Sequence, residues 1–193
     1  MDAAVGPDPA DHVGASVTIL DAATDLRVDL DVWPTMMRLV DCLCTELAES
    51  GLDTCFCGVL PGQAIAAQYV NTKTREGMAW VRLNGAWPYS ALFPAADTTA
   101  QCASPLAYEI EIGSLFCAPA FADSRGTPPT LAAQFEATQV QMAAMAAMRR
   151  AIVCCLGTGK RAVLGQYTPL GPEGDVVGGT WTVIVDGGLT RGV

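Results

Sequence analysis

Residues 108–117 read YEIEIGSLFC, and the alternation within this stretch decides how the rest of the chain is arranged. Side chains of a β-strand point in turn to its two faces, and one face here is apolar. That face carries Tyr108, Ile110, Ile112 and Phe116. The opposite face carries Glu109, Glu111 and Leu115. We therefore predict a strand with one buried side, and we expect part of the other side to face water or the lumen of an assembly.

An amphipathic helix is predicted both before and after this strand. Residues 34–50 begin at Pro34, which suits a first helical turn, and their apolar side chains recur at gaps of four and three. These side chains are Met36, Val40, Leu43 and Leu47. Residues 128–156 follow Thr127, a candidate N-cap, and carry a longer stripe at the same gaps. The stripe consists of Leu131, Phe135, Thr138, Met142, Met145, Arg149, Ile152 and Leu156. We expect both helices to cover the sheet.

The remaining segments complete the predicted fold. Further strands are expected at residues 54–60, 78–83, 161–167 and 180–185. The order α-β-β-β-α-β-β groups strands apart from helices, which favours an α+β domain with a largely antiparallel sheet covered by two helices. The length fits one such domain, predicted for residues 34–193. Residues 1–33, with their prolines, glycines and recurring aspartates, are expected to form an extended N-terminal arm. Residues 84–106 are expected to form a long ordered connection.

The composition narrows the classes of function. The formal net charge is −9, which argues against a surface that wraps nucleic acid, because phosphate binding depends on clustered Lys and Arg. It is compatible with a channel through which DNA passes without sticking to an acidic wall. No apolar stretch approaches the roughly 20 residues that span a bilayer, and the acidic start of the chain lacks the features of a secretory signal. We expect synthesis in the cytosol and no membrane partner.

No arrangement of residues in the sequence predicts an enzyme. Residues 157–160, Gly-Thr-Gly-Lys, match part of the phosphate-loop motif, but they follow a predicted helix and lack the leading glycine of that motif. Glu109 and Glu111 are expected about 6–7 Å apart on one strand face, which suits glycosidase carboxylates, although such a pair is more often simply solvated. The only histidine, His12, lies in the predicted arm with no partner in view. We expect no catalytic residue and no cofactor.

Eight cysteines raise the question of zinc or redox chemistry. They fall at Cys42, Cys44, Cys55, Cys57, Cys102, Cys117, Cys154 and Cys155. Two C-x-C pairs with a single histidine match no common zinc spacing. In a reducing cytosol we expect the cysteines to pack as small apolar side chains without a metal. A cysteine-rich zinc or redox module remains the alternative.

Two motifs near the C-terminal end of the sequence carry a resemblance to a known protein family. They are the segments Pro169-Leu170-Gly171-Pro172-Glu173-Gly174 and Gly178-Gly179-Thr180-Trp181-Thr182-Val183. They follow the long helix, which itself follows a strand ending in Phe116-Cys117-Ala118-Pro119. In this combination the chain resembles the tail terminator and head-to-tail neck proteins of siphophages that infect actinobacteria. The resemblance covers residues 34–186 and leaves the acidic arm outside it.

The resemblance implies a structural virion protein in place of an enzyme. It implies a ring, usually of six copies, that caps the tail tube at the head–tail junction and assembles in the cytoplasm of the bacterial host. The implied partners are further copies of this chain, the major tail tube protein and a head-completion or stopper protein. Genomic DNA would pass through the lumen without specific binding. A stopper or adaptor of the same neck is the alternative.

A ring subunit needs side surfaces that meet its neighbours. Candidate contacts within the connection 84–106 are Trp87, Tyr89, Leu92 and Phe93. Aromatic residues are enriched at interface cores, but these side chains equally fit a satellite core beneath a long loop. Lys73 and Arg75 are candidates to meet an acidic neighbour. Glu109 and Glu111 are candidates to line the lumen.

Overall fold

The computed structural model describes residues 32–62, 70, 76–89, 92–99, 104–118, 128–156, 161–173 and 176–187. Its elements in chain order are α1 (Val32–Glu49), β1 (Thr54–Val59), β2 (Gly77–Pro88), β3 (Leu106–Cys117), α2 (Leu131–Leu156), β4 (Ala162–Glu173) and β5 (Val176–Asp186). The α+β class and the order α-β-β-β-α-β-β are therefore confirmed. The predicted arm and His12 lie outside the described residues.

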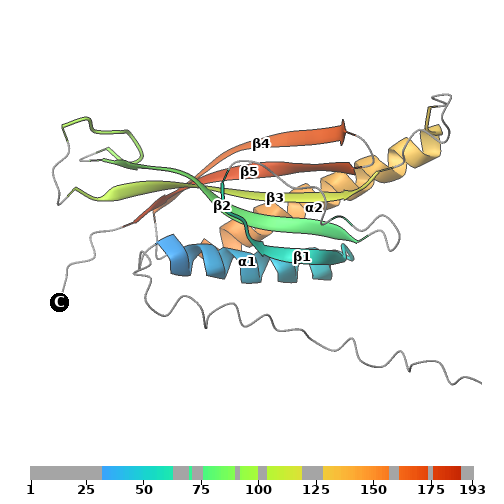
Figure 1. Cartoon of the computed structure of the whole chain (residues 1–193), viewed down its shortest axis with the longest axis horizontal. Coiled ribbons are helices and arrows are strands. Elements are labelled where there is room, and N and C mark those ends of the chain that lie inside the picture. Colours follow the sequence, from blue (N-terminus) through green and yellow to red (C-terminus); the bar gives the residue numbers. More distant parts are fainter. Residues whose placement is uncertain are drawn as a thin grey trace, which may run out of the picture.

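The five strands form one mixed sheet in the order β1-β2-β3-β5-β4. β1 runs parallel to β2, and the other neighbouring pairs are antiparallel. β3, which contains residues 108–117, lies at the centre of the sheet, where Ile112 pairs with Val81 on one side and with Trp181 on the other. Both helices lie on the same face of the sheet (Figure 1).

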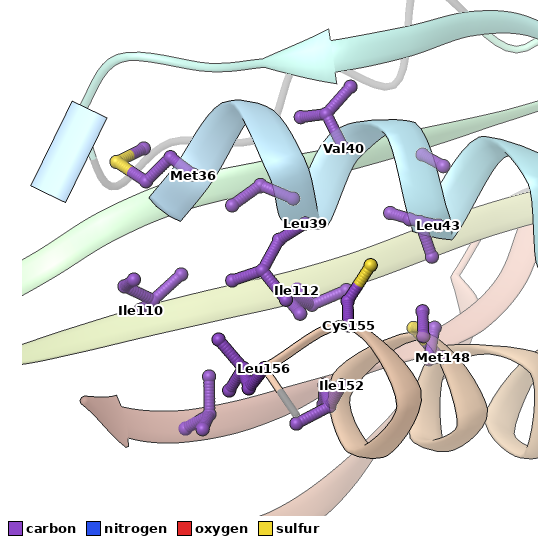
Figure 2. Packing of buried hydrophobic residues seen from close by; sticks show 14 of the residues in the cluster. Met36, Leu39, Val40, Leu43, Ile110, Ile112, Met148, Ile152, Cys155 and Leu156 are labelled. Atoms are coloured by element: carbon purple, nitrogen blue, oxygen red, sulfur yellow. The ribbon is translucent and has the colours of Figure 1, made fainter. Parts of the chain in front are cut away.

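The main core lies between the two helices and the sheet. Figure 2 shows Leu39 and Leu43 of α1, Ile110 and Ile112 of β3, and Met148 and Ile152 of α2 gathered there. The predicted apolar faces of α1 and β3 are both buried in this core, which confirms them. A smaller cluster on the opposite face of the sheet contains Met78, Trp80 and Leu115.

Helix boundaries differ from the prediction by a few residues. α1 begins two residues before Pro34 and is followed by Gly51, whose φ is 71°. α2 begins at Leu131, because the hydroxyl of Thr130 accepts a hydrogen bond from the N–H of Ala133 at 3.2 Å and caps the helix. The predicted cap, Thr127, lies outside the described residues.

The expected connection 84–106 is shorter than predicted. β2 continues to Pro88 and β3 starts at Leu106, and these two residues pair with each other. A bulge between Leu83 and Gly85 lets the ladder continue where the side-chain alternation is lost. β2 and β3 therefore reach one end of the molecule, where β5 accompanies β3 up to the pair Ala107–Asp186; we call the last residues of β2 and the first residues of β3 the ribbon (Figure 1).

The predicted apolar stripe of α2 is wrong for its first half, and in the second half it is offset from the buried face. There Arg149 is exposed and Met145 is half-buried, and the buried residues are Ala144, Ala147, Met148, Ala151, Ile152, Cys155 and Leu156. Leu131, Phe135 and Met142 are exposed, and burial against the sheet starts at Ala144. The physical reason is that the beginning of α2 extends past the sheet, as Figure 1 shows at the opposite end from the ribbon. No helix in the described part of the chain is both long enough and apolar enough to cross a membrane.

Candidate assembly surfaces

Glu111 is buried in an ion pair on the face of the sheet away from the helices. Only 7% of this residue is exposed, and its Oε1 lies 2.8 Å from Nε of Arg82, which is equally buried. Arg82 Nη2 donates to Glu111 Oε2 at 2.9 Å, and Trp80 Nε1 donates to Oε1 at 3.0 Å. Asn84 Nδ2 donates to Oε2 at 3.3 Å.

The expectation that both glutamates face water or a lumen is therefore wrong for Glu111. Strand register places Arg82 directly opposite Glu111, so the guanidinium neutralises the carboxylate inside the protein. Glu109, two residues earlier on the same face, is half-buried. A carboxylate held by Trp80, Asn84 and the guanidinium of Arg82 is not available to act beside Glu109 as a glycosidase pair.

The aromatic candidates lie at the far end of the β2–β3 ribbon. Trp87 Nε1 donates to the carbonyl of Pro94 at 2.8 Å, which fastens the loop onto the ribbon. Tyr89 is buried, its ring packs edge-on against Phe93, and its hydroxyl donates to Asp186 Oδ1 at 2.5 Å. Burial, followed by that hydrogen bond, raises the pKa of Tyr89 to about 12.

Of these four candidates, Tyr89 belongs to a satellite core beneath the loop, and it is not a contact residue. Leu92, by contrast, is 76% exposed. Phe93 is partly exposed, and the guanidinium of Arg161 lies 5.2 Å from the centre of its ring. The pattern of the sequence gave no sign of Arg161, because it lies 68 positions from Phe93. The other predicted contacts, Lys73 and Arg75, lie outside the described residues.

We call Leu92, Phe93, Arg161 and Val163 the tip surface. Arg161 precedes β4 and Val163 lies two residues later, so both point to the same side of the chain. β4 is an edge strand, and Val163 is 41% exposed. The tip surface thus combines apolar side chains with one exposed cation.

A second exposed apolar surface lies on the first half of α2. Leu131 is 85% exposed, Phe135 is 65% exposed and Met142 is 44% exposed. Glu136 is the only charged residue between positions 131 and 148. We call Leu131, Phe135, Glu136 and Met142 the overhang surface. Loss of charged residues together with exposed large apolar side chains is typical of an interface core.

A cavity of about 330 Å³ lies beside the overhang surface. It is bounded by the flank of α2, the turn before β1 and the end of β3, and its lining includes Leu52, Asp53, Phe116, Cys117, Glu136 and Val140. The two carboxylates make its rim acidic. No histidine lies in the described part of the chain, so no Cys–His or Ser–His nucleophile is formed there.

Four cysteines are joined in two disulfides. Cys42 of α1 is bonded to Cys155 of α2, and Cys44 of α1 is bonded to Cys57 of β1. Their Cα atoms lie 6.3 and 6.0 Å apart, within the usual range for disulfides. The expectation that the cysteines pack only as free thiols is therefore wrong for these four. They were missed because each bond joins elements whose contact depends on the tertiary fold.

The described residues contain no group of three or more His, Cys, Asp or Glu side chains that could hold a metal ion. No protein-family model matches the chain, and no curated protein sequence matches it. The surfaces described above are therefore the basis on which a function is proposed.

Proposed function

We propose that this chain is a structural protein that assembles with copies of itself into a ring, as a tail terminator of a long-tailed bacteriophage does. The observation that carries the proposal is the overhang surface. It leaves large apolar side chains in water on a rigid helix, at a site where the chain's own sheet does not reach. Burying Leu131 and Phe135 against a partner would stabilise the assembly by about 1.5–3 kcal/mol for each side chain.

Two further features support a terminator in particular. The described fold has the strand, the long helix and the closing strands in the order on which the resemblance rests. The net charge of −9 suits a wall past which genomic DNA moves without binding. The proposed partners are the major tail tube protein on one side and a head-completion protein on the other. A stopper or adaptor would share the ring but would not bind the tube.

The test is a mass measurement on the purified chain, alone and with purified tail tubes, joined to electron micrographs of the tubes. We expect one ring at one end of each tube. Phe135→Ser should abolish ring formation without lowering the melting temperature, because Phe135 is 65% exposed.

The matched control is Met37→Ser, since Met37 is 39% exposed on α1, away from the overhang surface, and should form rings normally. A chain that neither self-associates nor binds tubes would refute the proposal. Rings that form but do not bind tubes would support self-assembly and would refute the proposed role as a tail terminator.

A further inference from the structure

We infer that residues 17–20, Val-Thr-Ile-Leu, add a further strand to the free edge of β4 in the same copy of the chain. This strand addition completes the sheet of a single copy, so it is independent of the proposed ring. Residues 17–20 lie outside the described residues. Three observations support the inference, namely the exposed edge of β4, the sequence of these four residues, and the length of chain that joins them to α1.

The outer edge of β4 offers backbone groups to a further strand. β4 is the last strand of the sheet, and no described strand lies on its outer side. The backbone N–H of Asp186 donates to the carbonyl of Arg161 at 2.9 Å, so residue 161 bonds towards β5. Bonding groups alternate along an antiparallel strand, so the N–H and C=O groups of Ala162 and Leu164 point away from β5. Each of these two residues therefore offers one donor and one acceptor outward.

This part of the edge lacks the features that usually keep other strands from pairing with it. Proteins protect exposed edges with proline, charged side chains or bulges. In β4 the first irregularity comes after Leu164, and the first proline is Pro169. Residues 162–166 contain neither a proline nor a charged side chain, and all of them are exposed. An edge of this kind is expected to be covered in the folded protein.

The side chains at this edge fit a partner strand that is apolar on both faces. Leu164 is 37% exposed on the face that carries the helices, and its neighbour Val163 is 41% exposed on the other face. In an extended segment, Val17 and Ile19 share one face and Leu20 lies on the other. A strand formed by this segment would therefore place an apolar side chain beside each exposed side chain of the edge.

The sequence before α1 contains one run that favours such a strand at this edge. Among residues 1–31, only residues 17–20 include three consecutive β-branched side chains, the type most enriched in strands. Residues 26–30 also alternate apolar and charged side chains, but a single residue joins them to α1. Because α1 packs against β1 and β2, at the other side of the sheet, residues 26–30 cannot reach β4.

The length of the intervening chain lets residues 17–20 reach the edge of their own sheet. Residues 21–31 join them to α1, and an extended chain of this length spans up to about 36 Å. The sheet, with strands spaced by about 4.8 Å, is only about 19 Å wide. Tethering gives the segment an effective concentration of about 1 mM at its own sheet. In dilute solution this exceeds the concentration of other copies, so the segment of the same copy fills the edge.

Hydrogen exchange of backbone amides, measured by NMR on the full chain, tests the strand addition. The double variant Thr18→Pro/Ile19→Pro removes a donor from the added strand in either register. We expect the amides of Ala162 and Leu164 to exchange about tenfold or more faster in this variant than in the wild type. The matched control is Ala3→Pro/Ala4→Pro, which lies outside the segment and should exchange as the wild type does. Equal exchange in the wild type and in Thr18→Pro/Ile19→Pro would overturn the inference.

Photocross-linking identifies the occupant of the edge. The full chain with p-benzoylphenylalanine at the exposed position 163 is irradiated at about 1 µM, far below the effective concentration of the tethered segment. We expect links to residues 16–21 within a single chain. Links between two copies, to β4 or to residues 16–21, or the absence of any link to residues 16–21, would overturn the inference. A chain that forms no ring can still show the expected link, and rings of a chain without that link would leave the proposed function intact.

Discussion

Replacing Glu111 by glutamine removes the charge that neutralises a buried arginine and keeps nearly the same shape. Glu111 and Arg82 are each only 7% exposed, and two oxygens of the carboxylate contact the guanidinium at 2.8 and 2.9 Å. Breaking a buried pair by removing one partner costs about 3–5 kcal/mol, since the remaining charge stays out of water. We expect the lower end of that range, about 3 kcal/mol, because glutamine still accepts a hydrogen bond from Trp80.

Urea unfolding at neutral pH, followed by tryptophan fluorescence and circular dichroism, measures this loss. With a urea m value of about 2 kcal/mol/M, the midpoint should fall by about 1.5 M while the slope stays the same. The matched control is Glu109→Gln on the same strand face, which is half-buried and should change the free energy of unfolding by no more than about 0.5 kcal/mol.

A second substitution separates lost charge from lost shape. Adding Arg82→Met to Glu111→Gln removes the unpaired guanidinium, so the double variant should be more stable than Glu111→Gln alone. If Glu111→Gln costs less than about 1 kcal/mol, as the Glu109 control should, the pair is hydrated in solution and the account of the buried ion pair is wrong.

Three more predictions concern packing, cross-links and pH. Gly178→Ala should lower the free energy of unfolding by about 1–3 kcal/mol, because the new Cβ would meet the backbone carbonyl of Ser114; an unchanged urea midpoint would contradict this close approach. Cys44→Ala should cost about 3 kcal/mol in the oxidised protein through loss of its disulfide and little in the reduced protein, whereas equal losses in both would show that the bond does not form in solution. Because the pKa of Tyr89 is raised from 10.0 to about 12, its stabilising effect is complete below pH 10 and is lost as the pH rises towards 12; Tyr89→Phe should flatten that alkaline decline in melting temperature, and an identical decline would refute the assignment.

Local sequence patterns predict the helices and strands that bury one apolar face along their whole length. α1 was predicted within two residues because Pro34 and Gly51 lie near its ends and one face is apolar throughout. β1 was predicted one residue too long, and the other four strands were predicted too short, because side-chain alternation does not extend over their full length. Beyond Leu83, β2 continues through a bulge and keeps its backbone pairing, which side-chain alternation does not record.

The features missed in the sequence all depend on contacts between distant positions. Arg82 and Glu111 meet because the register of β2 and β3 brings together residues 29 positions apart. The apolar stripe of α2 was visible, but periodicity reports only that a face is apolar. Whether that face meets the chain's own sheet or another molecule depends on where the sheet ends, which is why Leu131 and Phe135 were assigned to the core.

The closing motif that carries the family resemblance has a structural cause in this chain. Gly178 leaves room for the carbonyl of Ser114, and Gly179 leaves room for the ring of Tyr167. Trp181 then donates from Nε1 to the carbonyl of Met145 at 3.2 Å, which ties β5 to α2. The two glycines therefore allow the close approach of β5 to its neighbours β3 and β4, and Trp181 holds α2 on the sheet; none of these three contacts uses the exposed ends of the molecule.

A motif of this kind is evidence of a shared fold before it is evidence of a shared role. The position of α2 on the sheet nevertheless has a consequence for the proposed assembly. Gln141 donates to the carbonyl of Gly178 at 2.5 Å, so α2 is anchored there and its earlier turns extend beyond the sheet. Gln141→Ala would remove this hydrogen bond, so the first half of α2 could shift and change the position of Phe135 and the rest of the overhang surface. In the proposed assembly the overhang surface makes the contact, and the motif would contribute to it by fixing the direction in which the start of α2 points.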